Sequence, residues 1–167
     1  VFDGPADHNG CRNHDEVRFW IDYLRGEAAS YLVDDRGVAG GLAADASFVC
    51  LGDLNADPQD GDGRREAIER LLKHERVIDP QPRSPGAAEA AGRNSAGASG
   101  RGDVGMHTAT FGPGRSLRLD YVLPSRSLKV IGSGVHWPLS SNRQSHALDA
   151  SDHRLVWVDL ELSWSDR

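Results

Sequence analysis

The chain has 167 residues, a length that suits one domain with a real hydrophobic core. Hydrophobic residues make up 38% of it and charged residues 26%, which excludes a disordered chain, and no apolar run approaches the length of a membrane-spanning helix. The net charge of −6 argues against a protein dedicated to gripping duplex nucleic acid, because such proteins usually present a basic face to the phosphates.

The sequence begins without a methionine, and its first ten residues, VFDGPADHNG, have the character of a loop rather than of a signal peptide. We therefore expect the chain to be part of a longer protein. Its two cysteines, Cys11 and Cys50, are too few for a disulfide framework and lack the spacing of metal ligands.

The first predicted element is a helix over Asn13–Leu24, where apolar residues recur at helical spacing from Val17 onward. Asn13 and Glu16 have the spacing of a capping box, which predicts that the helix begins at Asn13. A strand is predicted over Phe48–Leu51. This run is apolar at every position, as expected for a strand covered on both faces.

A short second helix is predicted after this strand, with Ile68, Leu71 and Leu72 on its inward face. Residues 80–105 are rich in Pro, Gly, Ala, Ser and Arg, which predicts a long, flexible surface loop. Further strands are predicted within 116–125, 128–138 and 151–164. This order of elements indicates an α/β fold in one domain, with an antiparallel component near the C-terminus.

Polar residues follow the first predicted strand directly, in the sequence GDLNADP over residues 52–58. A turn is one interpretation, since Gly, Asp, Asn and Pro are ordinary turn residues, and it suffices for Asp57 and Pro58. The other is a site that binds a metal ion or a phosphate. A calcium-binding EF-hand loop is excluded, because Pro58 stands where glycine is required and Arg64 where the bidentate glutamate belongs.

Three short motifs stand in chain order: GDLN at residues 52–55, RLDYVLPS at 118–125 and SDH at 151–153, with ATF at 109–111 before the second. This order resembles the C-terminal half of the endonuclease/exonuclease/phosphatase superfamily, the DNase I-like metal-dependent phosphoesterases. The resemblance implies a four-layer α/β sandwich of which this chain, residues 1–167, is the C-terminal portion, with the N-terminal half absent. The opening residues look like a bacterial branch whose members are often exported, which implies a secreted or cell-envelope protein.

The resemblance also implies roles for five residues. Asp53 would orient or deprotonate the attacking water and contact the metal through water, and Asn55 would hold the scissile phosphate. Asp152 would contribute to the metal site, and His153 would contact the phosphate or act as acid and base. Asp120 would orient His153, although the strand pattern alone also allows a solvent-facing acid paired with Arg118. The implied cofactor is Mg²⁺ or Mn²⁺, whose hard ions prefer carboxylate ligands, and the implied substrate is a small phosphoester.

Two other functions stay open at this point. One is a catalytically silent binding module with the same fold, and the other is a nuclease, which the acidic balance disfavours. The superfamily's earlier metal ligands, and the histidine ahead of its central helix, would lie upstream of Val1. We therefore expect the chain by itself to have little or no activity.

Overall fold

The computed structural model describes residues 4–93, 102–112 and 115–162. The α-helices are α1 (His8–Tyr23), α2 (Glu66–Leu72) and α3 (Pro85–Arg93), and the 3-10 helices are η1 (Gly4–Ala6), η2 (Gly26–Ala28), η3 (Val104–Met106) and η4 (Arg143–Ala150). The strands are β1 (Val49–Asp53), β2 (Ala109–Thr110), β3 (Ser116–Leu117), β4 (Asp120–Pro124), β5 (Lys129–Val135) and β6 (Val156–Glu161). This mixture of helices and small sheets agrees with the predicted α/β class. The four-layer sandwich stays a prediction.

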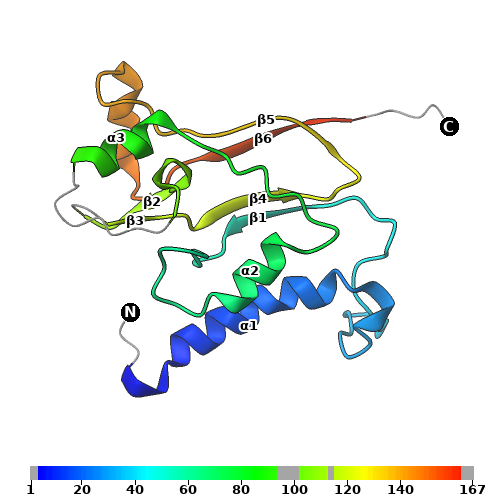
Figure 1. Cartoon of the computed structure of the whole chain (residues 1–167). Coiled ribbons are helices and arrows are strands. Elements are labelled where there is room, and N and C mark those ends of the chain that lie inside the picture. The colour runs from blue at the N-terminus through cyan, green and yellow to red at the C-terminus, as the bar shows by residue number, and fades with distance from the viewer. Residues whose placement is uncertain (1–3, 94–101, 113–114, 163–167) are drawn as a thin grey trace.

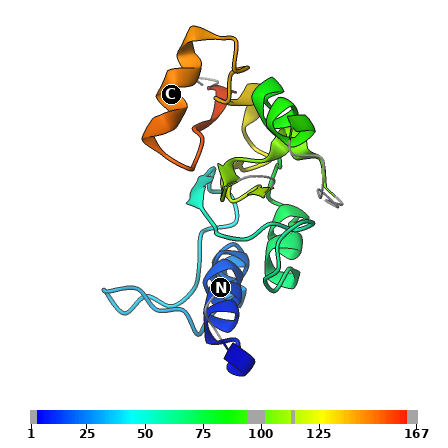
Figure 2. The same cartoon turned by 90° about the vertical axis from the view of Figure 1, so that its left-hand side faces the viewer.

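The strands form three antiparallel pairs, β1–β4, β2–β3 and β5–β6. Strand β6 packs beside β4, so β1, β4, β6 and β5 follow one another across the molecule (Figure 1). Figure 2 shows the same strands from the end, with α1 and α2 at one extreme and α3 and η4 at the other. None of the helices in the described part of the chain is long and apolar enough to cross a bilayer.

The main core lies between α1, α2 and the β1–β4 pair. Its buried members are Val17, Ile21, Leu24, Ala67, Ile68, Leu71, Val77, Tyr121 and Leu123. Ile68 and Leu71 are buried, as predicted for the second helix, while Leu72 is partly buried against the same core. A smaller core joins α3 to β5 and β6 through the buried Ala87, Val135 and Trp137 and the partly buried Val156.

The predicted helix start is wrong. Helix α1 begins at His8, with Asp7 in the left-handed region at φ 48° and no side-chain cap. Asn13 lies inside the helix and its side-chain amide donates to the Leu54 carbonyl at 3.0 Å. The asparagine was interpreted as a local cap, but its partner is 41 residues away, a contact that local spacing does not reveal.

Strand β1 is covered on one face only within the described residues, which corrects the expected burial of both. Cys50 lies opposite Leu123 and packs against the main core, whereas Leu51, opposite Val122, is 68% exposed. Alternate residues of a strand point to opposite faces, so a run that is apolar throughout does not by itself fix how many faces are covered.

Residues 80–105 are not a loop throughout. Pro85–Arg93 forms helix α3, whose Ala87 is buried against Trp137 and Val135. Small alanines let this helix lie close to its neighbour, and Gly86 donates its N–H to the Trp137 carbonyl at 2.9 Å. The rest of the predicted loop includes residues 94–101, which lie outside the described residues.

Candidate active site

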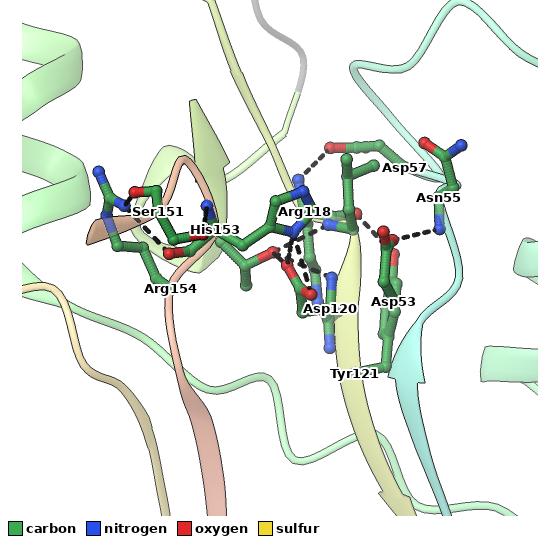
Figure 3. Close-up of polar contacts among 11 residues, drawn as sticks. Asp53, Asn55, Asp57, Arg118, Asp120, Tyr121, Ser151, His153 and Arg154 are labelled. Atoms are coloured by element: carbon green, nitrogen blue, oxygen red, sulfur yellow. Dashed lines mark hydrogen bonds and ion pairs between the residues drawn. The ribbon is translucent and has the colours of Figure 1, made fainter. Parts of the chain in front are cut away.

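Two aspartates face each other across the β1–β4 pair. In the antiparallel register Asp53 is the partner of Asp120, at the end of β1 and the beginning of β4 (Figure 3). Like charges directly opposite one another destabilise a strand pair. Their juxtaposition therefore favours a cationic partner that could relieve the repulsion.

His153 is the third member of this group. Its Nδ1 lies 2.9 Å from Asp120 Oδ2 and 3.2 Å from Oδ1. Because an ionised carboxylate only accepts hydrogen bonds, Nδ1 donates in this contact and the neutral ring has Nε2 as its acceptor nitrogen. Partial burial lowers the pKa of His153, but the hydrogen bond and charge of Asp120, with the charges of Asp53 and Asp152, outweigh burial and raise the pKa above its ordinary value.

Thr108 fixes the carboxylate of Asp120 from the buried side. This fully buried threonine donates its hydroxyl hydrogen to Asp120 Oδ2 at 2.7 Å. The hydroxyl oxygen of Thr108 in turn accepts the backbone N–H groups of Leu119 and Asp120, both at 3.0 Å. Asp120 therefore has one carboxylate oxygen held by Thr108 and His153 together, which fixes its orientation toward the histidine.

The SDH segment is attached to β2 before it enters β6. An isolated bridge pairs His153 with Ala109, and Arg154 N–H donates to the Thr108 carbonyl at 2.7 Å. The backbone carbonyl of Asp152 accepts the N–H of Thr110 at 2.9 Å. The Asp152 side chain is exposed, and although its charge acts on His153, it does not belong to the group of close ligand atoms formed by Asp53, Asp120 and His153.

Asn55 lies on a loop that several contacts hold in place. Its backbone is in the left-handed region at φ 46°, which asparagine tolerates better than most residues, and its N–H donates to Asp53 Oδ1 at 2.7 Å. Tyr121 Oη donates to the Ala56 carbonyl at 2.7 Å. In Figure 3 the Asn55 amide lies on the side of Asp53 away from His153. The side chain borders the site without contacting Asp120 or His153 in any hydrogen bond found.

Arg118 does not pair with Asp120, so the alternative interpretation of Asp120 as a surface acid is wrong. The guanidinium of Arg118 is buried and donates to both carboxylate oxygens of Asp79, at 2.8 and 2.5 Å. It also lies over the Tyr121 ring, 4.6 Å from the centroid. Asp57 accepts the Arg118 backbone N–H at 2.8 Å and forms a turn, in agreement with its exclusion from the site.

A model of the endonuclease/exonuclease/phosphatase family matches residues 3–153, most of the chain. The chain belongs to this family. Searches of the curated proteins and of the solved structures gave no match. Endonuclease/exonuclease/phosphatase proteins generally hydrolyse phosphoesters with the help of divalent metal ions.

The residues of this family member fit such an ion. One ligand atom from each of Asp53, Asp120 and His153 lies within 4.8 Å of the other two. Carboxylate oxygens suit hard divalent cations, and Asp53 is exposed enough for an ion to reach it. The donor set is therefore compatible with a metal at the open ends of β1 and β4.

Five residues of this endonuclease/exonuclease/phosphatase chain were singled out from sequence. The structure brings three of them, Asp53, Asp120 and His153, into one group, and leaves Asn55 and Asp152 at its border. Thr108 was missed as an individual residue. It stands one position before the ATF motif, so a polar residue that precedes a motif in a buried segment was the available signal.

Proposed function

We propose that this chain supplies catalytic residues to a divalent-metal-dependent phosphoesterase, in which an activated water attacks phosphorus in line with the leaving oxygen. The observation that carries the proposal is the register of β1 and β4, which sets Asp53 opposite Asp120 with His153 bonded to Asp120. Two opposed carboxylates with an oriented histidine suit phosphoester chemistry, which needs charge compensation and proton transfer at one point.

Each residue has a part in this proposal. Asp120, held by Thr108, keeps Nδ1 of His153 occupied, so that Nε2 faces the reaction as donor to a phosphate oxygen when the ring is protonated. Asp53 orients the attacking water or accepts its proton. Asn55 donates its side-chain amide to the phosphate, since a neutral amide does not repel that anion.

The metal in this proposal is Mg²⁺ or Mn²⁺. Asp53 and Asp120 would hold it, with the charge of Asp152 nearby, and the ion would offset charge on the non-bridging phosphate oxygens. The net charge of −6 favours a small phosphomonoester or phosphodiester over duplex DNA as substrate. The full-length protein is the form to assay.

The test is hydrolysis of p-nitrophenyl phosphate by that protein with Mg²⁺ or Mn²⁺, and its loss on chelation. Asp53→Ala and His153→Ala should each lower kcat by about 100-fold or more, the usual range for a lost acid–base or electrostatic group. His146→Ala, which changes an exposed histidine of η4, is the matched control and should leave the rate as it is. Unchanged rates in both site variants would refute the proposal.

A further inference from the structure

A pocket of about 480 Å³ is lined in part by Asn55, and Asp53, Asp120 and His153 are not among its lining residues. We propose that it binds the alcohol part of the substrate, and that this part is a neutral, hydroxyl-rich ring such as a sugar or cyclic polyol. The inference rests on the proposed function, because it assigns the portion of the phosphoester that does not react. The volume falls within the range of about 300–1,000 Å³ typical of small-molecule sites.

The position of the pocket links it to the reaction. Its walls come from the N-terminal part of α1, from the loop that follows β1 and from the β2–β3 hairpin. Phe111 lines it and also meets the ring of His153 edge-on, with centroids 6.4 Å apart. A phosphate held between Asn55 and His153 would therefore have its ester group at the mouth of this pocket.

The charges of the pocket argue against a second anionic group on the substrate. Arg64 lies 2.7 Å from an Asp7 oxygen, and Arg115 lies 3.1 Å from an Asp62 oxygen, so each cation already has an acidic partner in the lining. Asp57 adds a further buried carboxylate. The lining therefore has no surplus positive charge with which to attract another phosphate.

The polar groups suit hydroxyl groups instead. The lining contains asparagine amides, carboxylates and guanidinium groups, with Asn13 and Asn55 among them. A hydroxyl both donates and accepts, so vicinal hydroxyls can bond to such a mixed rim without an unmatched partner. Leu117 and Leu119, both buried, add an apolar surface on which the C–H face of a ring can rest.

A nucleobase fits this lining less well. Phe111 is the one aromatic side chain among the described lining residues, and the guanidinium of Arg115 already lies over its ring, 5.9 Å from the centroid. The stacking surface that a base requires is thus partly covered. Hydrogen bonds to hydroxyls remain the larger source of selectivity.

The test compares two esters with the same kind of leaving group, glucose 6-phosphate and n-hexyl phosphate, in the full-length protein with Mg²⁺. We expect kcat/KM to be about tenfold or more higher for the sugar ester, the worth of one or two hydrogen bonds to hydroxyls. Asp62→Ala should reduce this ratio several-fold, while Asp45→Ala, an exposed acid outside the pocket, should not.

Three results would overturn the inference. They are equal or better hydrolysis of n-hexyl phosphate, a preference for adenosine 5′-monophosphate over ribose 5-phosphate, or a preference for a sugar bisphosphate that Arg115→Ala abolishes. If no ester is hydrolysed, the proposed function fails and the pocket is judged separately. An NMR titration with glucose should then still shift the amide signals of Asn55 and Phe111, and the lack of such shifts would reject the pocket as well.

Discussion

Two groups of two aspartates and one histidine occur in the described part of this protein, and they have different surroundings. The first, the site cluster, consists of Asp53, Asp120 and His153. The second, the buried cluster, consists of Asp57, Asp60 and His107. In each, one ligand atom from every residue lies within 4.8 Å of the others, so composition and spacing do not separate them.

The buried cluster is bonded to the protein itself. Asp57, only 5% exposed, accepts the backbone N–H groups of Gln59 and Asp60 with one oxygen and that of Arg118 with the other, all at 2.8 Å. His107 has Ser116 Oγ at 2.7 Å and Asp60 Oδ2 at 3.2 Å on its two ring nitrogens. These contacts tie the loop after β1 to the β2–β3 hairpin, which is a structural task.

In the site cluster the two acids lie opposite each other, and Asp120 is bonded to Thr108 and His153. Asp53 is exposed, and the hydrogen bond found for its carboxylate is the one from the Asn55 N–H. Backbone N–H groups bind Asp57 in the buried cluster, whereas the side chains of Thr108 and His153 bind Asp120 in the site cluster. The two clusters have the same composition but different hydrogen-bond partners, and this difference favours a structural role for the buried cluster and supports the chemical role proposed for the site cluster.

The largest expected difference between the clusters is from Asp57→Ala, which should destabilise the fold by about 3 kcal/mol because three backbone N–H groups, that of Arg118 buried, lose a charged acceptor. Urea denaturation measures this. Asp53→Ala in the metal-free protein should be neutral or slightly stabilising, since it removes a like charge opposite Asp120. Comparable losses in the two variants would mean that the clusters do not differ as described.

Metal binding should respond in the opposite sense. Asp53→Asn should weaken Mg²⁺ binding about 10- to 100-fold, as expected when a metal site loses an important group, whereas Asp60→Asn should leave it nearly unchanged. Isothermal titration calorimetry on the full-length protein gives both values. Retained Mg²⁺ affinity in Asp53→Asn would contradict metal binding at the site cluster. Lost affinity in Asp60→Asn would indicate that the buried cluster binds the metal.

Thr108 offers a smaller test, because it acts on the site through Asp120. Thr108→Val keeps the shape but removes the hydroxyl, and should lower kcat by about tenfold, corresponding to one lost hydrogen bond to a charged group. Thr108→Ser should restore most of the rate. If Val and Ser were equally slow at equal thermal stability, the effect would come from packing rather than from the hydroxyl.

The smallest expected effect is on the titration of His153 in the metal-free protein. Its pKa should lie above about 6.5, the value of an unperturbed histidine, and Asp120→Asn should lower it. The stabilisation from the charged pair is fully present below that ordinary value and is lost as the pH rises through the raised one. NMR titration of the ring protons measures the pKa of His153 in the original protein and in Asp120→Asn. An unchanged pKa in Asp120→Asn would show that the two side chains are not coupled.

The sequence predicted the polar residues near the strand ends better than it predicted the long-range pairing and hydrogen bonds that position them. The motifs around Asp53, Asp120 and His153 each have a local signal, an acid predicted at a strand boundary or within a strand, and the structure places Asp53 and Asp120 at such boundaries. The register that opposes Asp53 to Asp120 does not, because pairing between segments far apart in the chain is absent from either segment's own pattern. The same holds for Asn13, whose partner is a distant carbonyl rather than its own helix end.

The two helical misjudgements have different causes. The Pro, Gly and Ala content of residues 80–105 resembles a linker, yet Pro85 suits the first turn of a helix and the alanines suit close packing on Trp137. For α1, the apolar stripe identified the helix correctly, and only its start was misplaced. Apolar spacing identifies only the buried face of a helix. The polar residues of α1 that precede Val17 are not part of a buried face, so the spacing does not show where the helix begins.

Strand β1 packs against the core on one face and presents Asp53 on the other, with Cys50 inward and Asp53 outward. A slip of one residue against β4 would exchange the two, turning a carboxylate toward α1 and α2 and a thiol toward solvent. A misaligned copy of this protein would thus be unstable and would also lack the proposed site. Proteases and chaperones that remove poorly folded chains would therefore also remove the chains in which the site is misassembled.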